Sequence, residues 1–330
     1  MKILSFAELC DLMASRPARD QFGPLSDMPY LVFEIGSENS QLALDLQALP
    51  CPVIGFQTDT CAPDIEAACD VVLDDVKLAE RICHNIAQTP MAALVLVQQL
   101  RLSENLPIDQ ALHAESFAYA SLQKSALFLE RLEQIARVEP LAEDGPVLLL
   151  QTDRDSTTQK EVLSLTLNRP ANLNAINTEL RDALSEAFEM ARHNDAISEV
   201  ILSAQGKSFS IGGALHEFGE APDALMAHMI RTYRLPAQYL VRLNKPLRVH
   251  IDGAAIGAGI EMAAFAQHLT ATEKAWFQLP ELKYGLIPGA GGTVSVLQRI
   301  GRHKTALMAL SMKKISAQMA YEWGLVDALV

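Results

Sequence analysis

Two glutamates in apolar surroundings are the residues of this chain best suited to transfer protons. Glu261 lies in GAGIEMAAFA and Glu281 lies in FQLPELKYG, within a glycine- and alanine-rich stretch at 251–293. Small residues leave the neighbouring backbone N–H groups open to a ligand. A pair of carboxylates beside such groups predicts acid–base chemistry next to an oxygen that gains negative charge.

The neighbours of Glu261 bear on whether it is only a surface residue. A single glutamate in an apolar helix usually lies on the exposed polar face. The residues three and four positions away are Gly257, Ala258, Ala264 and Phe265, and none of them is polar. Two carboxyls in one partly desolvated cleft have pKa values that move apart, so that one becomes the neutral acid. The pattern therefore favours an acid and base pair.

Two glycine-containing loops, 209–213 (FSIGG) and 256–261 (IGAGIE), each follow a strand pattern and open a helical one. Backbone N–H groups at a helix N-terminus have no partner within the helix, so each loop could lend one N–H to the same oxygen. Taken singly, such a loop is more often a tight connection. Neither loop fits a dinucleotide or nucleoside triphosphate fingerprint.

The elements around these loops predict an α/β fold. Strand patterns at 162–170, 199–205 and 246–252 alternate with helical ones, which is typical of a largely parallel sheet. A polar turn joins a strand at 147–152 to the one at 162–170, as in a hairpin. Ligands of parallel sheets bind at the carboxyl ends of the strands, where both loops lie.

The first part of the chain has a different pattern. Strand, helix and strand patterns predict a small parallel βαβ unit at 30–36, 40–49 and 52–58. From 78 to 138 the sequence is a series of helical runs, whose apolar faces need a partner in this chain or in another subunit. The best linker lies at 143–146. We therefore expect one region at 1–140 and a second at 141–330.

Composition argues against two classes of partner. The formal net charge of −13 disfavours nucleic acid and anionic membranes, since both need a basic surface. No apolar stretch reaches the roughly 18 residues that span a bilayer, and the N-terminus does not resemble a signal peptide, so we expect a cytoplasmic protein. The cysteines lack the paired spacing of metal sites, so we expect reduced thiols and no metal. They are Cys10, Cys51, Cys61, Cys69 and Cys83.

Five strings in the second half are specific enough to indicate a family. They are LTLNRPANLNAIN at 165–177, GKSFSIGGALHEF at 206–218, HIDGAAIGAGIEMA at 250–263, FQLPELKYGLIPGAGGTVSVLQRIGRHKTALMAL at 277–310 and ISAQMAYEWGLVDALV at 315–330. Together they make the region from about 160 onward similar to the crotonase superfamily, also called enoyl-CoA hydratase/isomerase. The resemblance implies a crotonase-like ββα spiral core and an enzyme that acts on acyl-CoA thioesters.

The resemblance also implies roles for the residues above. The N–H groups of Ile211 and Ala258 would form the oxyanion hole for the thioester carbonyl. Glu261 would orient and deprotonate a water molecule, and Glu281 would supply a proton to the α-carbon, in a syn addition of water to a 2-enoyl-CoA or its reverse. Coenzyme A enters as part of the substrate, so no separate cofactor is expected. Loop glycines and one lysine would contact the substrate: Gly212, Gly213, Gly257, Gly259 and Lys207.

Departures from the family pattern concern the first loop and the end of the chain. Ala214 stands where the family usually has Asp, and Ile211 is bulky where a small residue is usual. Family members also usually continue beyond the position of Val330, in helices that cover the site and build a trimer. Residues 69–133 resemble that segment. We expect the N-terminal half to be a degenerate crotonase copy whose helices at 78–133 pack on 251–324, in the same chain or a neighbouring one.

Several alternatives stay open at this point. An unrelated helical regulatory domain is the second interpretation of the N-terminal half. Isomerase, dehydratase, hydrolase or decarboxylase chemistry would use the same loops, and a non-catalytic homologue acting as a subunit is the competing class. A homo-oligomer, either a trimer or a dimer of trimers, is implied by the resemblance. A carrier-protein thioester could replace CoA, and Arg231, Tyr233 and Arg234 could contact a functionalised acyl chain.

Overall fold

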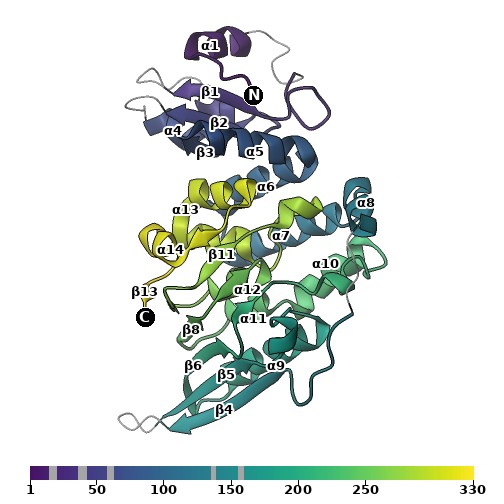
Figure 1. The fold of residues 1–330 in the computed structure, drawn as a ribbon, viewed down its shortest axis with the longest axis vertical. Helices are drawn as coiled ribbons and strands as arrows, with labels where there is room; N and C mark the ends of the chain where they lie inside the picture. The colour runs from purple at the N-terminus through teal and green to yellow at the C-terminus, as the bar shows by residue number, and fades with distance from the viewer. Residues whose placement is uncertain (15–20, 36–42, 58–62, 135–138, 155–159) are drawn as a thin grey trace.

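The computed structural model describes residues 1–14, 21–35, 43–57, 63–134, 139–154 and 160–330 (Figure 1). Cys61 lies outside the described residues. The molecule is elongated, with the N-terminal strands at one end and the strands of the largest sheet at the other. The core that holds the predicted site residues lies between these two ends.

The largest sheet has six strands in the order β13-β10-β8-β6-β5-β4. Only β4 and β5 pair antiparallel, which is the predicted hairpin; the other neighbours are parallel. Alternate residues of β5 are buried, as expected for a strand with one face on the core. The bounds are β4 Leu148–Arg154, β5 Glu161–Leu167, β6 Ile197–Ala204, β8 Leu247–Ile251, β10 His268–Ala271 and β13 Ala328–Leu329.

A second sheet of four short strands, in the order β12-β11-β9-β7, positions the glycine-containing loops. The strands β7, β9 and β11 are parallel, so their carboxyl ends meet at one edge. The bounds are β7 Ser208–Ser210, β9 Ala254–Ile256, β11 Trp276–Gln278 and β12 Ile315–Ser316. Both predicted loops therefore leave this edge, next to each other.

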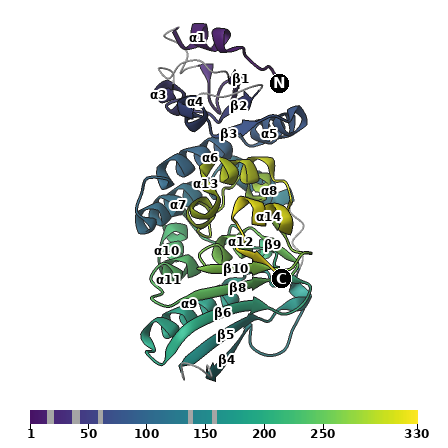
Figure 2. The same ribbon diagram turned by 90° about the vertical axis from the view of Figure 1, so that its left-hand side faces the viewer.

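Helices of the second half lie beside and above the strands of the two sheets in the view of Figure 2. Asn177 caps the first of them by accepting from the Leu180 amide at 2.9 Å. The bounds are α9 Thr178–His193, α10 Ala224–Arg234, α11 Pro236–Leu240, α12 Ala258–Ala263, α13 Gly292–Ser311 and α14 Ala317–Trp323.

One predicted helix start was wrong. The loop at 206–214 leads only into a single 3₁₀ turn, Leu215–Glu217. A regular helix begins after Asp223, whose carboxylate accepts from the Met226 amide at 2.7 Å and so supplies the N-cap that the loop itself lacks.

The N-terminal part contains the predicted parallel βαβ unit. Its three strands pair parallel in the order β1-β2-β3, and short helices complete a small hydrophobic core of their own around Phe33 and Leu46. The bounds are α1 Phe6–Ala14, β1 Leu31–Ile35, α3 Ala43–Gln47, β2 Val53–Gln57, α4 Pro63–Ala68 and β3 Val71–Leu73.

Helices α5 to α8 join the core of the second half within the same chain, as the sequence predicted for 78–133. They share its hydrophobic core, and the side chains of Arg81 and Asn85 both donate to carbonyls at the C-terminal end of α13, at 2.9 Å each. The bounds are α5 Val76–Gln88, α6 Pro90–Ser103, α7 Ile108–Leu122 and α8 Ala126–Gln134. Whether this part descends from a crotonase copy stays a prediction, as does the boundary near 140.

The last of the helical runs expected between 78 and 138 is divided into α7 and α8, where the Ser125 hydroxyl accepts from the Phe128 amide at 3.2 Å at the start of α8. Residues 135–138 lie outside the described residues. No helix in the described part of the chain is long and apolar enough to cross a membrane.

Candidate active site

A cavity of about 1010 Å³ brings the predicted acid–base and oxyanion residues together. Its walls come from α7, α10 and α12 and from the loops that follow β7, β9 and β11. Glu261, Glu281, Ile211 and Ala258 all line it. Side chains from both halves of the chain therefore face one space.

Glu261 lies in the first turn of α12 and is almost completely buried, with 2% of its surface exposed. Its Oε2 accepts from the amides of Ala290, at 2.6 Å, and Gly292, at 2.9 Å, at the start of α13. A side chain at Gly292 could not fit, since a Cβ there would lie 2.5 Å from the Cγ of Glu261. Burial raises the pKa of Glu261 from its ordinary 4.5 to about 8, although both amides favour the charged form.

Glu281 begins a 3₁₀ turn directly after Pro280, where β11 ends. Its Oε2 is buried and has no hydrogen-bond partner among the described residues. Gly257 lies against it: a Cβ at Gly257 would come within 2.6 Å of Oε1. Burial, and then the nearby Glu261, raise the pKa of Glu281 well above 4.5.

A third carboxylate at the site, Glu115 of α7, was missed by the sequence reasoning. Its Oε1 accepts from the Gly291 amide at 2.8 Å, and its Oε2 accepts from the Thr293 amide at 3.0 Å and the Thr293 hydroxyl at 2.7 Å. Burial raises its pKa, and its charge contributes to the raised pKa of Glu261.

The signal that pointed to Glu261 is also present around Glu115. The residues three and four positions away are Ala111, Leu112, Ala118 and Tyr119, and all of these neighbours are at least partly buried. The presence of apolar residues three and four positions on either side of a helical glutamate is therefore a signal in the sequence that indicates Glu115 as well as Glu261.

The two glycine loops are adjacent, but one predicted oxyanion amide already has a partner. A Cβ at Gly212 would lie 2.9 Å from the Ile256 carbonyl oxygen and 3.5 Å from the Ala258 nitrogen, so the loops touch. Ala258 is the first residue of α12, where an amide has no acceptor within the helix. The Ile211 amide donates to the Leu173 carbonyl at 3.2 Å. An oxygen held by both amides would have to share or displace that bond.

The remaining predicted contact residues divide into two groups. Gly212, Gly213 and Gly257 line the cavity. Gly259 and Lys207 are not among its lining residues. Gly259 instead allows α12 to pack on β7, since a Cβ there would be 2.9 Å from the Cβ of Ser210, and Lys207 is exposed.

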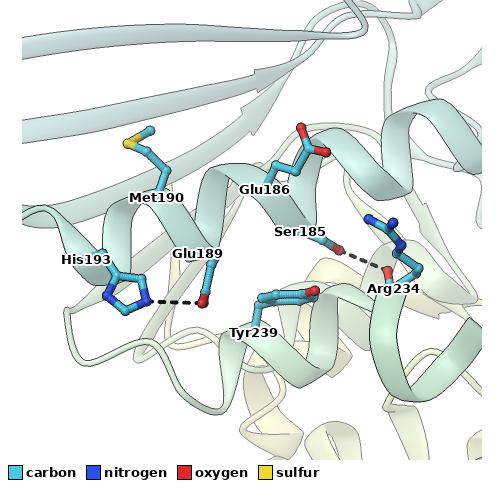
Figure 3. A pocket seen from close by; sticks show the side chains of 7 residues that line it. All are labelled: Ser185, Glu186, Glu189, Met190, His193, Arg234 and Tyr239. Atoms are coloured by element: carbon cyan, nitrogen blue, oxygen red, sulfur yellow. Dashed lines mark hydrogen bonds and ion pairs between the residues drawn. The ribbon is translucent and has the colours of Figure 1, made fainter.

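Of the three residues of α10 considered for the acyl chain, only Arg231 lines the cavity. Tyr233 is 60% exposed. Arg234 lines a separate pocket of about 280 Å³ beside α9, together with Glu189 and His193 (Figure 3). Its carbonyl accepts from the Ser185 hydroxyl there, at 2.9 Å. The expectation for Tyr233 and Arg234 is therefore not supported by their position.

Comparisons with known proteins match the second half of the chain. The model of the family described as enoyl-CoA hydratase/isomerase matches residues 157–330. A 2,3-dehydroadipyl-CoA hydratase of Escherichia coli is 39% identical over 169 residues, which are 51% of this chain and 66% of that protein. A 1,2-epoxyphenylacetyl-CoA isomerase of Escherichia coli is 34% identical over 180 residues, 53% of this chain and 68% of that protein.

The fold comparison agrees with the sequence comparison. A crystal structure from Legionella pneumophila, described as an enoyl-CoA hydratase/isomerase (crotonase), superposes with a TM-score of 0.51 at 26% identity. The superposition covers 56% of this chain and 70% of that one. The predicted crotonase-like α/β fold is thus confirmed. The chain spans about two thirds of the length of the two Escherichia coli relatives.

Proposed function

The chain belongs to the enoyl-CoA hydratase/isomerase family, and we propose that it adds water to a 2-enoyl-CoA thioester, or removes it in the reverse reaction. The observation that carries the proposal is the placement of two carboxyls, the buried Glu261 and the partly buried Glu281, on one cavity beside the Ala258 amide. An acid, a base and a hydrogen-bond donor for the carbonyl are the groups that this addition needs.

The surroundings of the two glutamates support different roles. Glu261 uses Oε2 for both backbone amides, which leaves Oε1 to orient and deprotonate the water. With a pKa of about 8 it is partly ionised in mildly alkaline solution. The pKa of Glu281 is raised well above 4.5 and its Oε2 has no partner among the described residues. Glu281 is therefore the carboxyl that holds a proton and gives it to the α-carbon.

The enolate-like charge that develops on the thioester oxygen would be held by the amides of Ala258 and Ile211. Removing one donor of such a pair typically costs about 10²–10³ in rate. Because the Ile211 amide donates to Leu173, we propose that substrate binding draws this amide toward the thioester oxygen.

Isomerisation is the second candidate, and one similar protein bears an isomerase name. It moves a double bond by proton transfer at two carbons and adds no water. The two reactions separate in one experiment with purified protein. Hydration consumes the ultraviolet absorbance of a conjugated 2-enoyl-CoA, whereas isomerisation of a 3-enoyl-CoA creates it. We expect consumption. Creation without consumption would favour the isomerase, and no change with either thioester would favour a non-catalytic homologue.

A further inference from the structure

Arg231 places a positive charge on the wall of the cavity. It reaches the cavity from α10, and its guanidinium carbon lies 3.7 Å from the centre of the Tyr119 ring of α7. Its Nε is buried and has no hydrogen-bond partner among the described residues, and neither Nη atom forms a hydrogen bond or ion pair with one of them. A guanidinium has five N–H donors in a fixed plane, so this one keeps its full donor capacity for a ligand.

The carboxylates nearby do not use this capacity. Glu115 and Glu261 are close enough for the charge of Arg231 to lower their pKa values, partly offsetting burial. Neither of them forms an ion pair with Arg231 in the described part of the chain: Glu115 directs both oxygens, and Glu261 directs Oε2, to amides of the turn at 290–293. A cation at such a site is stabilised most by an anion with two oxygens.

Gly289 shows how close Arg231 lies to the proton-transfer residues. A Cβ at Gly289 would lie 2.4 Å from Nη2 of Arg231 and 2.1 Å from Cδ2 of Tyr119. The next residue, Ala290, donates its amide to Glu261. The guanidinium is therefore beside the turn that fixes Glu261, and only a short acyl segment separates the reacting carbons from it.

We propose that the natural acyl group ends in a carboxylate a few carbons beyond the double bond and that Arg231 binds this carboxylate. The inference rests on the proposed function, because it takes the reacting carbons to lie between Glu261 and Glu281. Stacking on Tyr119 holds the guanidinium plane, so both oxygens of a carboxylate can bind in parallel. A chain that ends in a methyl group would leave the buried Nε of Arg231 without a partner.

Binding of two saturated acyl-CoA probes of equal chain length tests the inference without turnover. Adipyl-CoA ends in a carboxylate and hexanoyl-CoA ends in a methyl group. We expect the unmodified protein to bind adipyl-CoA about 10- to 100-fold more tightly, as charge-assisted hydrogen bonds imply. Arg231→Met should abolish this preference and Arg231→Lys should keep part of it. Arg234→Met, in the separate pocket, should leave the preference unchanged.

Equal or tighter binding of hexanoyl-CoA by the unmodified protein would overturn the inference. It would also be overturned if Arg231→Met kept its thermal unfolding transition but lost affinity equally for both probes. Failure to bind either probe would contradict the proposed function as well. Binding of both probes with the expected preference, but no hydration of any 2-enoyl-CoA, would contradict the proposed reaction alone.

Discussion

Glu115 and Glu261 bind alternate backbone amides of one turn. Glu261 accepts from Ala290 and Gly292, while Glu115 accepts from Gly291 and Thr293. The two glutamates come from opposite halves of the chain, yet each is held by two of the four successive amides of the same turn. The N-terminal helices thus do more than cover the core, because one of them holds the turn that orients the proposed base.

Glu115→Gln should move the pH dependence of hydration. The charge of Glu115 contributes to the raised pKa of Glu261, so removing it should lower that pKa. The acidic limb of kcat/KM, expected near pH 8, should shift to lower pH. The amide NH₂ of Gln would also face backbone donors, which should destabilise the protein by about 1–3 kcal/mol.

The matched control for this change is Glu80→Gln, on the exposed side of α5. It should alter neither the pH profile nor the unfolding midpoint in urea. A shift of the Glu115→Gln profile to higher pH, or no shift, would contradict the electrostatic link between Glu115 and Glu261.

Stability should fall as pH rises through the pKa of Glu261. The folded pKa of about 8 lies above the ordinary 4.5, so the folded state binds the proton more tightly than the unfolded state. The stabilisation from this group is fully present below pH 4.5 and is lost as pH rises through about 8. Between pH 5 and pH 9 the melting temperature should therefore decline less for Glu261→Gln than for the unmodified protein. An equal decline in both would show that Glu261 is already ionised at pH 5.

Gly257→Ala should damage the site through a direct clash. Gly257 has a φ of 49°, and a Cβ there would come within 2.6 Å of Oε1 of Glu281. Gly145→Ala is a matched control, because Gly145 also has a positive φ, of 81°, but nothing within 4 Å of its Cβ position. We expect each change to cost about 1 kcal/mol of backbone energy, measured by urea unfolding. Only Gly257→Ala should also reduce hydration, by at least about tenfold, and equal activity of the two variants would contradict the packing of Glu281 on Gly257.

Local patterns predicted those parts of the structure that depend on neighbours in sequence. The apolar ring around Glu261 and the βαβ unit at the N-terminus are of this kind. The family resemblance predicted that Glu261 and Glu281 share one site and that the two glycine loops lie together. The periodicity of apolar residues does not predict such contacts, because it carries no information about tertiary arrangement.

Other features depend on contacts that no local pattern carries. The Gly291 amide that Glu115 binds lies 176 positions away in sequence. The Leu173 carbonyl reaches the Ile211 amide because Leu173 adopts a left-handed backbone with a φ of 53°, which leucine rarely does. Each of these is decided by tertiary geometry.

The rate at which a conjugated 2-enoyl-CoA loses its absorbance, in Glu261→Gln and in Glu281→Gln, tests the central claim most directly. Both variants keep the shape of the site but lose a group that transfers a proton. We predict that each hydrates about 10²–10⁴-fold more slowly than the unmodified protein while still binding a saturated acyl-CoA. Hydration at the unmodified rate by either variant would contradict the assignment of these two glutamates as the acid and base.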